Sequence, residues 1–462
     1  MHQFWADLRE SVSGTELDFT TGSLSRAILL LSIPMVLEQV MEAIFALVDI
    51  FYVSGLGSDA VATVGITESM LTVIYALGGG LATGTTAIIA RRIGEKEPEK
   101  ASLAAVQAIL TGILVSLPIL FAGIFFSRDF LRIMGASEEV VNTGYRYTSI
   151  MLISNVVIML LYIINAVFRS AGDAAISMRV LIFANLVNII LDPCFIYGWG
   201  PFPEMGVQGA AVATTTGRSL AVLFQFYLLF RGKHRIKLKL SHIRVHLHVI
   251  ATLTRLALGG IGQNIIATLS WLFLVRITAM FGSEVLAGYT IAIRIIIFIL
   301  LPAWGLANAA ATLTGQNLGA GKPDRAERSV RITGIVNVLF VGIIAVFLIF
   351  NPSLFIKLFI DDQAVIHAGA ECLQTIGYGF VFYALGMVLV QAFNGAGDTL
   401  TPTKINLVCF WLIEIPLAYI LAIPAGMQEK GVYYSIAISE SLVTIIAFFL
   451  FRQGKWKLRR VE

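Results

Sequence analysis

Charged residues are scarce in this chain of 462 residues. They make up 13% of it, whereas hydrophobic residues make up 57%, and an ordinary soluble domain carries about 25% charged residues. This composition excludes a soluble protein and indicates a polytopic membrane protein. The only cysteines, Cys194, Cys372 and Cys409, show no CxxC or metal-ligand spacing. Disulfides and thiol sites are therefore not expected.

Motifs of catalysis and of ATP use are also missing. The six histidines lie in terminal segments, in loops or at the edges of apolar segments, and no Ser/His, HExxH or GxxxxGK[ST] pattern occurs. An enzyme or an ATP-driven machine is therefore not expected, and no cofactor is predicted. A net charge of +4 does not indicate a nucleic-acid partner, because the basic residues follow the membrane topology described next.

Twelve apolar windows are long enough to cross a bilayer, which takes about 20 residues as a helix. They lie near 27–53, 64–90, 102–126, 143–168, 177–198, 206–230, 249–279, 285–315, 328–350, 366–393, 401–424 and 430–451. The segments between them alternate in charge. One side holds 24 Lys and Arg, and the other holds 4, or 5 with Arg146. The positive-inside rule then places both termini in the cytoplasm, and the first residues show no cleaved signal peptide.

The sequence repeats itself at a constant offset of 225 residues. GLATGTTAIIARRIGEKEPEKA, which begins at Gly80, aligns without a gap on GLANAAATLTGQNLGAGKPDRA, which begins at Gly305, and AGD at 171–173 aligns on AGD at 396–398. An even number of helices per copy makes the repeat parallel, as in many transporters. We expect an N-terminal segment (1–26), an N-lobe (27–230), a basic cytoplasmic linker (231–248), a C-lobe (249–451) and a basic tail (452–462).

Three acids interrupt the first apolar window. At 100° per residue, Glu38, Glu42 and Asp49 fall on one face of a helix. A carboxylate at the centre of a membrane helix costs roughly 2.5–3.5 kcal/mol on insertion scales. This face is therefore expected to look into a bundle or a water-filled cavity. Glu38 lies nearest the cytoplasmic end, so an ordinary role, with its side chain reaching water, stays open for it.

The fifth and sixth windows supply polar partners for these acids. Asn185, Asn188 and Asp192 share one helical face in ANLVNIILDP, and Thr214 and Arg218 follow in GAAVATTTGRS. Carboxylates with an amide and a hydroxyl suit a hard cation such as Na⁺. Two close carboxylates can equally raise the proton affinity of one of them. The residues leave Na⁺ and H⁺ as alternatives.

The second half does not duplicate this group. The offset places Leu274 opposite Asp49 and Leu417 opposite Asp192. Glu440 interrupts the last window, the other buried acid of this half is Glu414, and the internal bases are Arg276 and Arg294. An Arg–Glu pair bracing the second bundle and a second coupling site are both compatible with these residues. The asymmetry favours ion coupling in the first half.

Several of these segments resemble the multidrug and toxic compound extrusion (MATE) family. The resemblance rests on SIPMV, LVDIFYVSGLGSDAVATVG, GEKEPEKA with its partner TGQNLGAGKPDRA, and NAVFRSAGDAAIS with its partner QAFNGAGDTLTPT. It covers about residues 24–452 and is closest to the DNA-damage-inducible, DinF-like branch. It implies an all-α membrane protein with two six-helix bundles that open alternately to either side, and export of organic cations or other amphipathic compounds as Na⁺ or H⁺ enters.

The resemblance also assigns residues. It implies Asp49, Asn188, Asp192 and Thr214 as Na⁺ or H⁺ ligands, with Asn165 joining their hydrogen-bond network. Further candidates for a substrate cavity are Glu38, Gln39, Glu42, Asn185, Arg218, Glu414 and Arg294. Glu42 and Arg218 depart from the family pattern, and they could pair with each other or change what the cavity accepts.

The remaining expectations concern partners and location. We expect a small-molecule substrate, a multi-pass protein of the cell membrane, no nucleic-acid partner and a monomer. The alternative function is a flippase or exporter of a lipid-linked or amphipathic metabolite. A flippase would need a strongly cationic cavity, whereas the first lobe carries four acids against Arg218.

Overall fold

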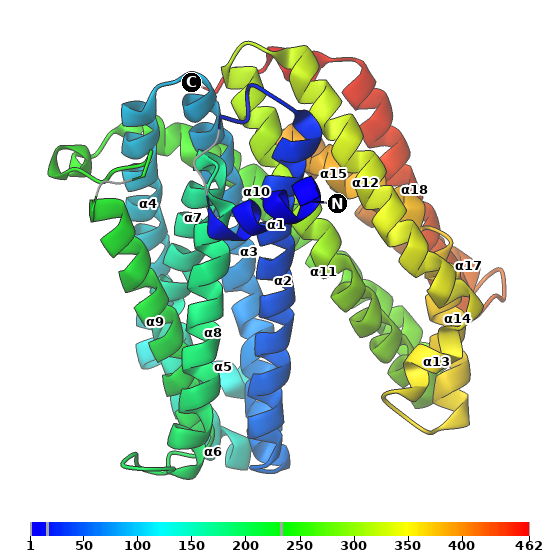
Figure 1. Ribbon diagram of the computed structural model, residues 1–462. Helices are drawn as coiled ribbons and strands as arrows, with labels where there is room; N and C mark the ends of the chain where they lie inside the picture. The colour runs from blue at the N-terminus through cyan, green and yellow to red at the C-terminus, as the bar shows by residue number, and fades with distance from the viewer. Residues whose placement is uncertain (1, 15–17, 232–233, 462) are drawn as a thin grey trace.

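The computed structural model describes residues 2–14, 18–231 and 234–461. Residues 1, 15–17, 232–233 and 462, which belong to the expected N-terminal segment, linker and tail, lie outside the described residues. Every regular element in the described ranges is a helix. Two bundles lie side by side, and they meet at the upper end of Figure 1 and diverge toward the lower end. The expected two-lobe, all-α membrane fold is confirmed.

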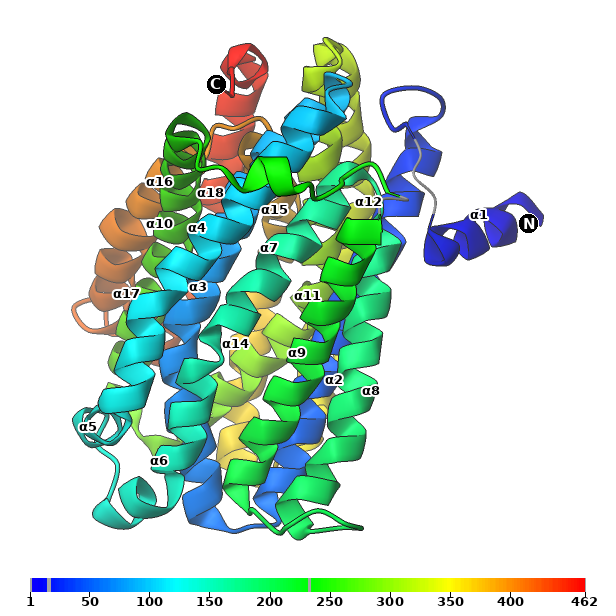
Figure 2. The same cartoon turned by 90° about the vertical axis from the view of Figure 1, so that its left-hand side faces the viewer.

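The N-lobe follows a short N-terminal helix, α1 (His2–Ser13), which the sequence did not lead us to expect. Its helices are α2 (Leu24–Ser54), α3 (Ser58–Gly94), α4 (Pro98–Phe125), α5 (Ser127–Ile133), α6 (Glu138–Ile153), α7 (Asn155–Ala171), α8 (Ala174–Tyr197) and α9 (Val207–Arg231). The linker contains the 3-10 turn η1 (Leu240–Ile243). It crosses the outside of α4 (Figure 2), where the side-chain amide of Gln107 donates to the carbonyls of His242 and Arg244 at 3.1 and 3.0 Å.

The C-lobe repeats this order. Its elements are α10 (Leu247–Thr278), η2 (Ala279–Phe281), α11 (Ser283–Gly319), α12 (Pro323–Phe350), α13 (Pro352–Lys357), α14 (Gln363–Gly377), α15 (Phe380–Gly395), α16 (Leu400–Asn406), the π-helical segment η3 (Leu407–Glu414), α17 (Ile415–Ala422) and α18 (Glu429–Arg452). The chain continues into η4 (Lys455–Leu458).

The offset of 225 governs the boundaries of the helices. α3 and α4 begin and end 225 residues before α11 and α12, respectively. Pro98 and Pro323 both occupy the first helical turn, where the missing N–H of proline costs nothing. Gly57 and Gly282 precede α3 and α11 with φ of 99° and 109°, a region that glycine enters without steric cost. The sequence repeat is therefore a structural repeat.

The membrane spans agree closely with the expected windows. Ten helical segments of the described chain are long and apolar enough to cross a bilayer, and the bent pair α14 and α15 makes eleven. The remaining window corresponds to α9, which has 25 residues and therefore a length of about 37 Å. It is less apolar because of its GAAVATTTGRS stretch. The cytoplasmic location of the two termini stays a prediction.

The lobes touch through glycines. A Cβ on Gly80 would lie 2.6 Å from the backbone nitrogen of Ile261, and one on Gly260 would lie 2.9 Å from the Cα of Gly80. Toward the upper end, a Cβ on Gly94 would lie 2.0 Å from the carbonyl oxygen of Gln316. Residues with a side chain do not fit at such backbone contacts. These contacts hold the lobes together at this end.

Both terminal segments cross between the lobes at the same end. Lys322 donates to the carbonyl of Thr20 at 2.9 Å, and Arg325 donates to the carbonyls of Phe19, Thr21 and Gly22 at 3.2, 2.7 and 2.9 Å. The C-terminal tail makes the reverse connection, from the C-lobe to the N-lobe.

Arg91 and Arg92 of the N-lobe donate to the carbonyls of Arg459 and Val461, each at 3.2 Å. We call the contacts of the two terminal segments, those made by Lys322 and Arg325 and those made by Arg91 and Arg92, the terminal straps.

Candidate functional site

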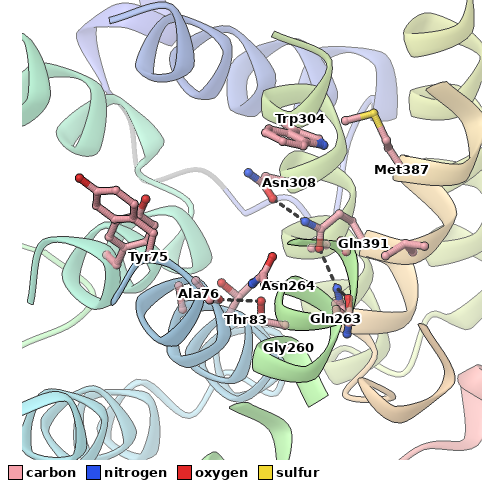
Figure 3. Close-up of a pocket in the computed structure, with 18 of the residues that line it drawn as sticks. Tyr75, Ala76, Thr83, Gly260, Gln263, Asn264, Trp304, Asn308, Met387 and Gln391 are labelled. Carbon is pink, nitrogen blue, oxygen red and sulfur yellow. Dashed lines mark hydrogen bonds between the residues drawn. The ribbon is translucent and has the colours of Figure 1, made fainter. Parts of the chain in front are cut away.

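A cavity of about 570 Å³ lies between the two lobes. Its walls come from α2, α3 and α7 on the N-lobe side and mainly from α10, α11 and α15 on the C-lobe side. Figure 3 shows Tyr75 of α3 on one side, and Trp304 and Asn308 of α11 on the other. A concave site with few convergent polar groups at a repeat interface is the usual place for a small-molecule ligand.

The repeat extends to the cavity wall. Most residues that line the N-lobe side have their counterparts, 225 positions later, on the C-lobe side. The pairs include Glu38 and Gln263, Gln39 and Asn264, Glu42 and Ala267, Thr83 and Asn308, Tyr162 and Met387, Asn165 and Val390, and Arg169 and Asn394. The two walls are thus equivalent in position and different in chemistry.

Two of the three acids of α2 line this cavity, and the third lies deeper in the N-lobe. Glu38 and Glu42 are lining residues. Glu38 is only 4% exposed, and its Oε1 accepts from Arg169 at 2.5 Å and from the amide of Asn165 at 3.3 Å. The possibility that Glu38 simply reaches water is therefore wrong, because its carboxylate forms a buried ion pair with α7.

The expected ion-site residues meet inside the N-lobe. The side-chain amide of Asn188 donates to Asp192 at 3.1 Å and to the hydroxyl of Thr214 at 3.2 Å. Thr214 also interacts with Asp49. All four side chains are buried, so α2, α8 and α9 converge on one polar group in an apolar bundle.

Three oxygens in this group have no hydrogen-bond partner in the part of the chain that the structure describes. They are Oδ1 of Asp49, Oδ1 of Asn188 and Oδ2 of Asp192. A buried oxygen without a donor costs about 1–3 kcal/mol, so the group is complete only with a further donor or cation. Carboxylate and amide oxygens with a hydroxyl fit Na⁺, and a proton on either carboxylate would also supply a donor. The described residues hold no group of three or more His, Cys, Asp or Glu side chains suited to a metal ion.

Asn165 does not join this group. Its amide donates to Glu38, its Oδ1 accepts from Gln225 at 2.6 Å, and its carbonyl accepts from Ser177 at 3.2 Å. The expectation that Asn165 extends the network around Asp192 is wrong for the described hydrogen bonds. Asn165 lies beside Glu38, about three turns of α2 from Asp49, and it belongs to the cavity wall.

Arg218 lies within the N-lobe near Glu42. Its guanidinium is 5.0 Å from the ring centre of Phe45 and also interacts with Tyr75, Glu42 and Glu68. No ion pair within contact distance joins Arg218 to Glu42 among the described residues, so the two charges attract at longer range. Asn185 braces two helices, because its amide donates to the carbonyl of Met41 at 2.8 Å. It does not line the cavity.

The C-lobe does not contain the expected Arg–Glu pair. Glu414 is buried and accepts from the hydroxyl of Ser270 at 2.7 Å. Arg276 and Arg294 are exposed, and no described ion pair joins either of them to Glu414. Arg294 is also absent from the cavity wall. The Arg–Glu pair and the place of Arg294 in the cavity are therefore both wrong. These arginines lie on the outward faces of α10 and α11, where they do not meet α17 or η3.

The sequence did not reveal several groups that the structure places at the site. Six amide side chains of the C-lobe line the cavity, which are Gln263, Asn264, Asn308, Gln391, Asn394 and Asn406. Glu440 of α18, which the sequence shows only as an acid within the last window, lines it as well. Glu68 of α3 interacts with Asp49 and Arg218. An alignment at the offset of 225 would have identified Gln263 and Asn394 as the counterparts of Glu38 and Arg169 in the second half.

The chain matches a known family over most of its length. The family model described as MatE matches residues 34–194 and 261–420. Similar curated proteins include a probable multidrug resistance protein, YoeA, of Bacillus subtilis, 23% identical over 95% of this chain and 96% of that protein. A probable multidrug resistance protein, NorM, of Thermotoga maritima is 24% identical over 93% of both chains. An FAD transporter of Shewanella oneidensis is 24% identical over 92% of this chain and 94% of that protein.

Solved structures agree with these relatives. A MOP superfamily transporter from Pyrococcus furiosus, described as having a binding pocket of reverse polarity, aligns with a TM-score of 0.89 at 25% identity over 96% of this chain and 98% of that one. An outward-facing multidrug resistance MATE transporter aligns with the same TM-score over the same shares. The chain belongs to the MatE family of multi-pass membrane transporters.

Proposed function

We propose that this chain is a secondary antiporter that exports organic cations or other amphipathic compounds in exchange for Na⁺ or H⁺, with the coupling ion bound in the N-lobe. The observation that carries the proposal is the group of Asp49, Asn188, Asp192 and Thr214, with its three unpartnered oxygens in a buried setting. One positive charge entering along the membrane potential supplies about 2.3 kcal/mol per 100 mV. The kinship with the DNA-damage-inducible branch is part of this proposal.

The cavity is the proposed substrate site. Its lining acids, Glu38, Glu42 and Glu440, outnumber its one lining base, Arg169, so its excess charge favours a cation. The same balance speaks against a flippase for a lipid-linked pyrophosphate, which would need an excess of basic residues. We propose that the protein acts as a monomer, since each copy contains both lobes of the cavity.

Alternating access is proposed from the arrangement of the lobes. The glycine contacts and the terminal straps lie at the end that carries the basic loops. With that end in the cytoplasm, as the positive-inside rule predicts, the lobes diverge toward the outside (Figure 1). The molecule would then be in an outward-facing state, and export would require these contacts to open and re-form in each cycle.

Transport in reconstituted vesicles tests the proposal. A Na⁺ gradient and a pH gradient are imposed separately, and efflux of cationic, zwitterionic and anionic dyes is compared. Cationic dyes should respond to one of the two gradients, and Asp49→Asn should abolish that response while Asp129→Asn, an exposed acid of α5, should not change it. Gradient-driven efflux at the normal rate by Asp49→Asn would overturn the assignment of the ion site.

A further inference from the structure

Four amide side chains of the C-lobe form a continuous hydrogen-bonded chain along the cavity. Oδ1 of Asn308 accepts from Gln391 at 2.9 Å, and Oε1 of Gln391 accepts from Asn394 at 3.1 Å (Figure 3). Asn394 and Gln263 exchange two hydrogen bonds at 3.0 and 3.2 Å. The chain joins α11, α15 and α10, so the three helices hold each amide plane in place.

The chain has one anchored end and one free end. At the anchored end, Gln263 also donates to the backbone carbonyl of Thr399 at 3.1 Å, and Gln263 and Asn394 are both buried. At the other end, the side-chain N–H groups of Asn308 have no partner among the described residues, and Asn308 lines the cavity. Since the bond from Gln391 fixes the oxygen of Asn308, its two N–H donors are oriented before any ligand arrives.

An aromatic ring and a thioether lie one helical turn from these amides. Trp304 precedes Asn308 by four residues on α11, and Met387 precedes Gln391 by four residues on α15, so each pair shares a helix face. Trp304 is 39% exposed although its helix neighbours Ala303 and Ala307 are fully buried. Figure 3 shows Trp304 and Met387 next to each other beyond Asn308 and Gln391. A flat apolar surface therefore adjoins a fixed edge of donors and acceptors.

We propose that this C-lobe wall, made of Trp304, Asn308, Met387 and Gln391, is a subsite for an uncharged planar heterocycle with a lactam edge, and that the ligand carries a cationic substituent directed at Glu42 on the opposite wall. A carboxamide presents a donor beside an acceptor, and it pairs in two-point fashion with a ring edge of the complementary pattern, as Asn and Gln do with nucleobases. The ring stacks on the indole. The subsite rests on the proposed transport function and deepens it.

The same wall discriminates against purely hydrophobic cations. A ligand without hydrogen-bonding groups covers the N–H donors of Asn308 and leaves them unsatisfied, which weakens its binding. The equivalent N-lobe position has no such edge, because Thr83, the counterpart of Asn308, already donates to the carbonyl of Gly79 at 2.9 Å. The two lobes therefore differ at this pair of positions.

Binding to the purified full-length protein tests the proposal with three probes. The first is a quinazoline-2,4-dione with an aminoethyl chain on N1, the second is its N3-methyl derivative, which has no ring N–H donor left, and the third is tetraphenylphosphonium. The variants are Asn308→Leu and Gln391→Met, which preserve side-chain volume, and Thr83→Val is the matched control at the equivalent N-lobe position. Unchanged thermal unfolding confirms that each variant folds.

The dione should bind wild type about tenfold more tightly than its N3-methyl derivative, as expected for a two-point contact. This preference should disappear in Asn308→Leu and Gln391→Met and persist in Thr83→Val, while tetraphenylphosphonium should bind Asn308→Leu several-fold more tightly than wild type, because that variant has no amide donors to leave unsatisfied. Equal binding of the two diones to wild type would overturn the subsite, as would a parallel loss of all probes in the variants. Gradient-driven transport of tetraphenylphosphonium without dione discrimination would overturn the subsite alone, whereas no transport of any probe would overturn the proposed function.

Discussion

The two lobes form a contact between equivalent positions, but the contact is an ion pair in one lobe and a pair of neutral hydrogen bonds in the other. In the N-lobe, α2 and α7 are joined by the ion pair of Glu38 and Arg169 at 2.5 Å. In the C-lobe, the equivalent helices α10 and α15 are joined by Gln263 and Asn394 through two neutral hydrogen bonds. The shared fold therefore brings these two positions into contact in both lobes. The residues of each lobe decide whether the contact is charged or neutral.

The surroundings of the two pairs differ in the same direction. Asn165 donates to Glu38, whereas its counterpart Val390 has nothing to donate. Glu42 stands where the C-lobe has Ala267. At these two positions the N-lobe has polar side chains beside its ion pair, whereas the C-lobe has Val390 and Ala267 beside its neutral pair. Duplication kept the hydrogen-bonding geometry while the electrostatic role was assigned to one copy.

The largest effect is expected from removing acids of the two lobes in parallel. Asp192→Asn should abolish gradient-driven efflux, because it removes one of the two carboxylates of the proposed ion site. Glu414→Gln should leave efflux within about twofold, since the hydroxyl of Ser270 can still donate to the new amide oxygen. Efflux from vesicles under the active gradient measures both. Loss of coupling in Glu414→Gln would place the second lobe in the coupling machinery and end the functional contrast.

The second prediction transplants the C-lobe pair into the N-lobe. Glu38→Gln alone leaves the guanidinium of Arg169 without its partner and should destabilise the protein by roughly 3 kcal/mol, as for other broken buried pairs. Adding Arg169→Asn recreates the neutral pair and should recover most of that loss. Thermal unfolding in detergent compares the two variants. A double variant less stable than Glu38→Gln would show that the two positions are not interchangeable.

The third prediction is the reverse transplant. Gln263→Glu with Asn394→Arg places the ion pair in the C-lobe, where Val390 provides no second donor to the carboxylate, such as the one that Asn165 gives to Oε1 of Glu38. The double variant should be less stable than wild type by about 1–3 kcal/mol, the cost of an unsatisfied buried polar atom. Adding Val390→Asn should return part of this stability. Unfolding midpoints that rank the triple variant below the double would contradict the role given to Asn165.

The smallest effect concerns a loop at which the copies differ in backbone strain. Lys96 has φ of 60°, and its counterpart Gly321 has φ of 69°. A residue with a Cβ costs roughly 1–2 kcal/mol in this conformation, so Lys96→Gly should raise the unfolding midpoint. Gly321→Lys should lower it by a similar amount. If the two changes had the same sign, strain would not be the difference between the loops.

Much of the architecture could be predicted from the sequence because it follows from composition and repetition. The helical windows depend on apolar length, because a bilayer makes length the dominant constraint, and the offset follows from the repeated motifs. The face shared by Glu38, Glu42 and Asp49 follows from helical periodicity alone. The convergence of Asp192 and Thr214, which lie on different helices, is implied only by the resemblance to the family.

The partners of these residues could not be predicted, because they depend on how helices are rotated against each other. Arg169 counts as a loop charge when topology is inferred, yet its guanidinium turns back to Glu38. Arg294 occupies a position within the span and faces outward, so its place in an apolar window says nothing about its partner. The amide chain has no sequence signature, since Gln263, Asn308 and Gln391 come from three helices and show no periodic spacing.

The terminal straps give the basic loops a second use. Arg91, Arg92, Lys322 and Arg325 are among the residues that the positive-inside rule counts when a nascent chain chooses its orientation. After folding, the same side chains donate to backbone carbonyls across the two lobes. Biogenesis and the working cycle thus share one set of charges. Selection on either process constrains the other, and engineering that reverses insertion by moving these charges would also unfasten the closed end of the transporter.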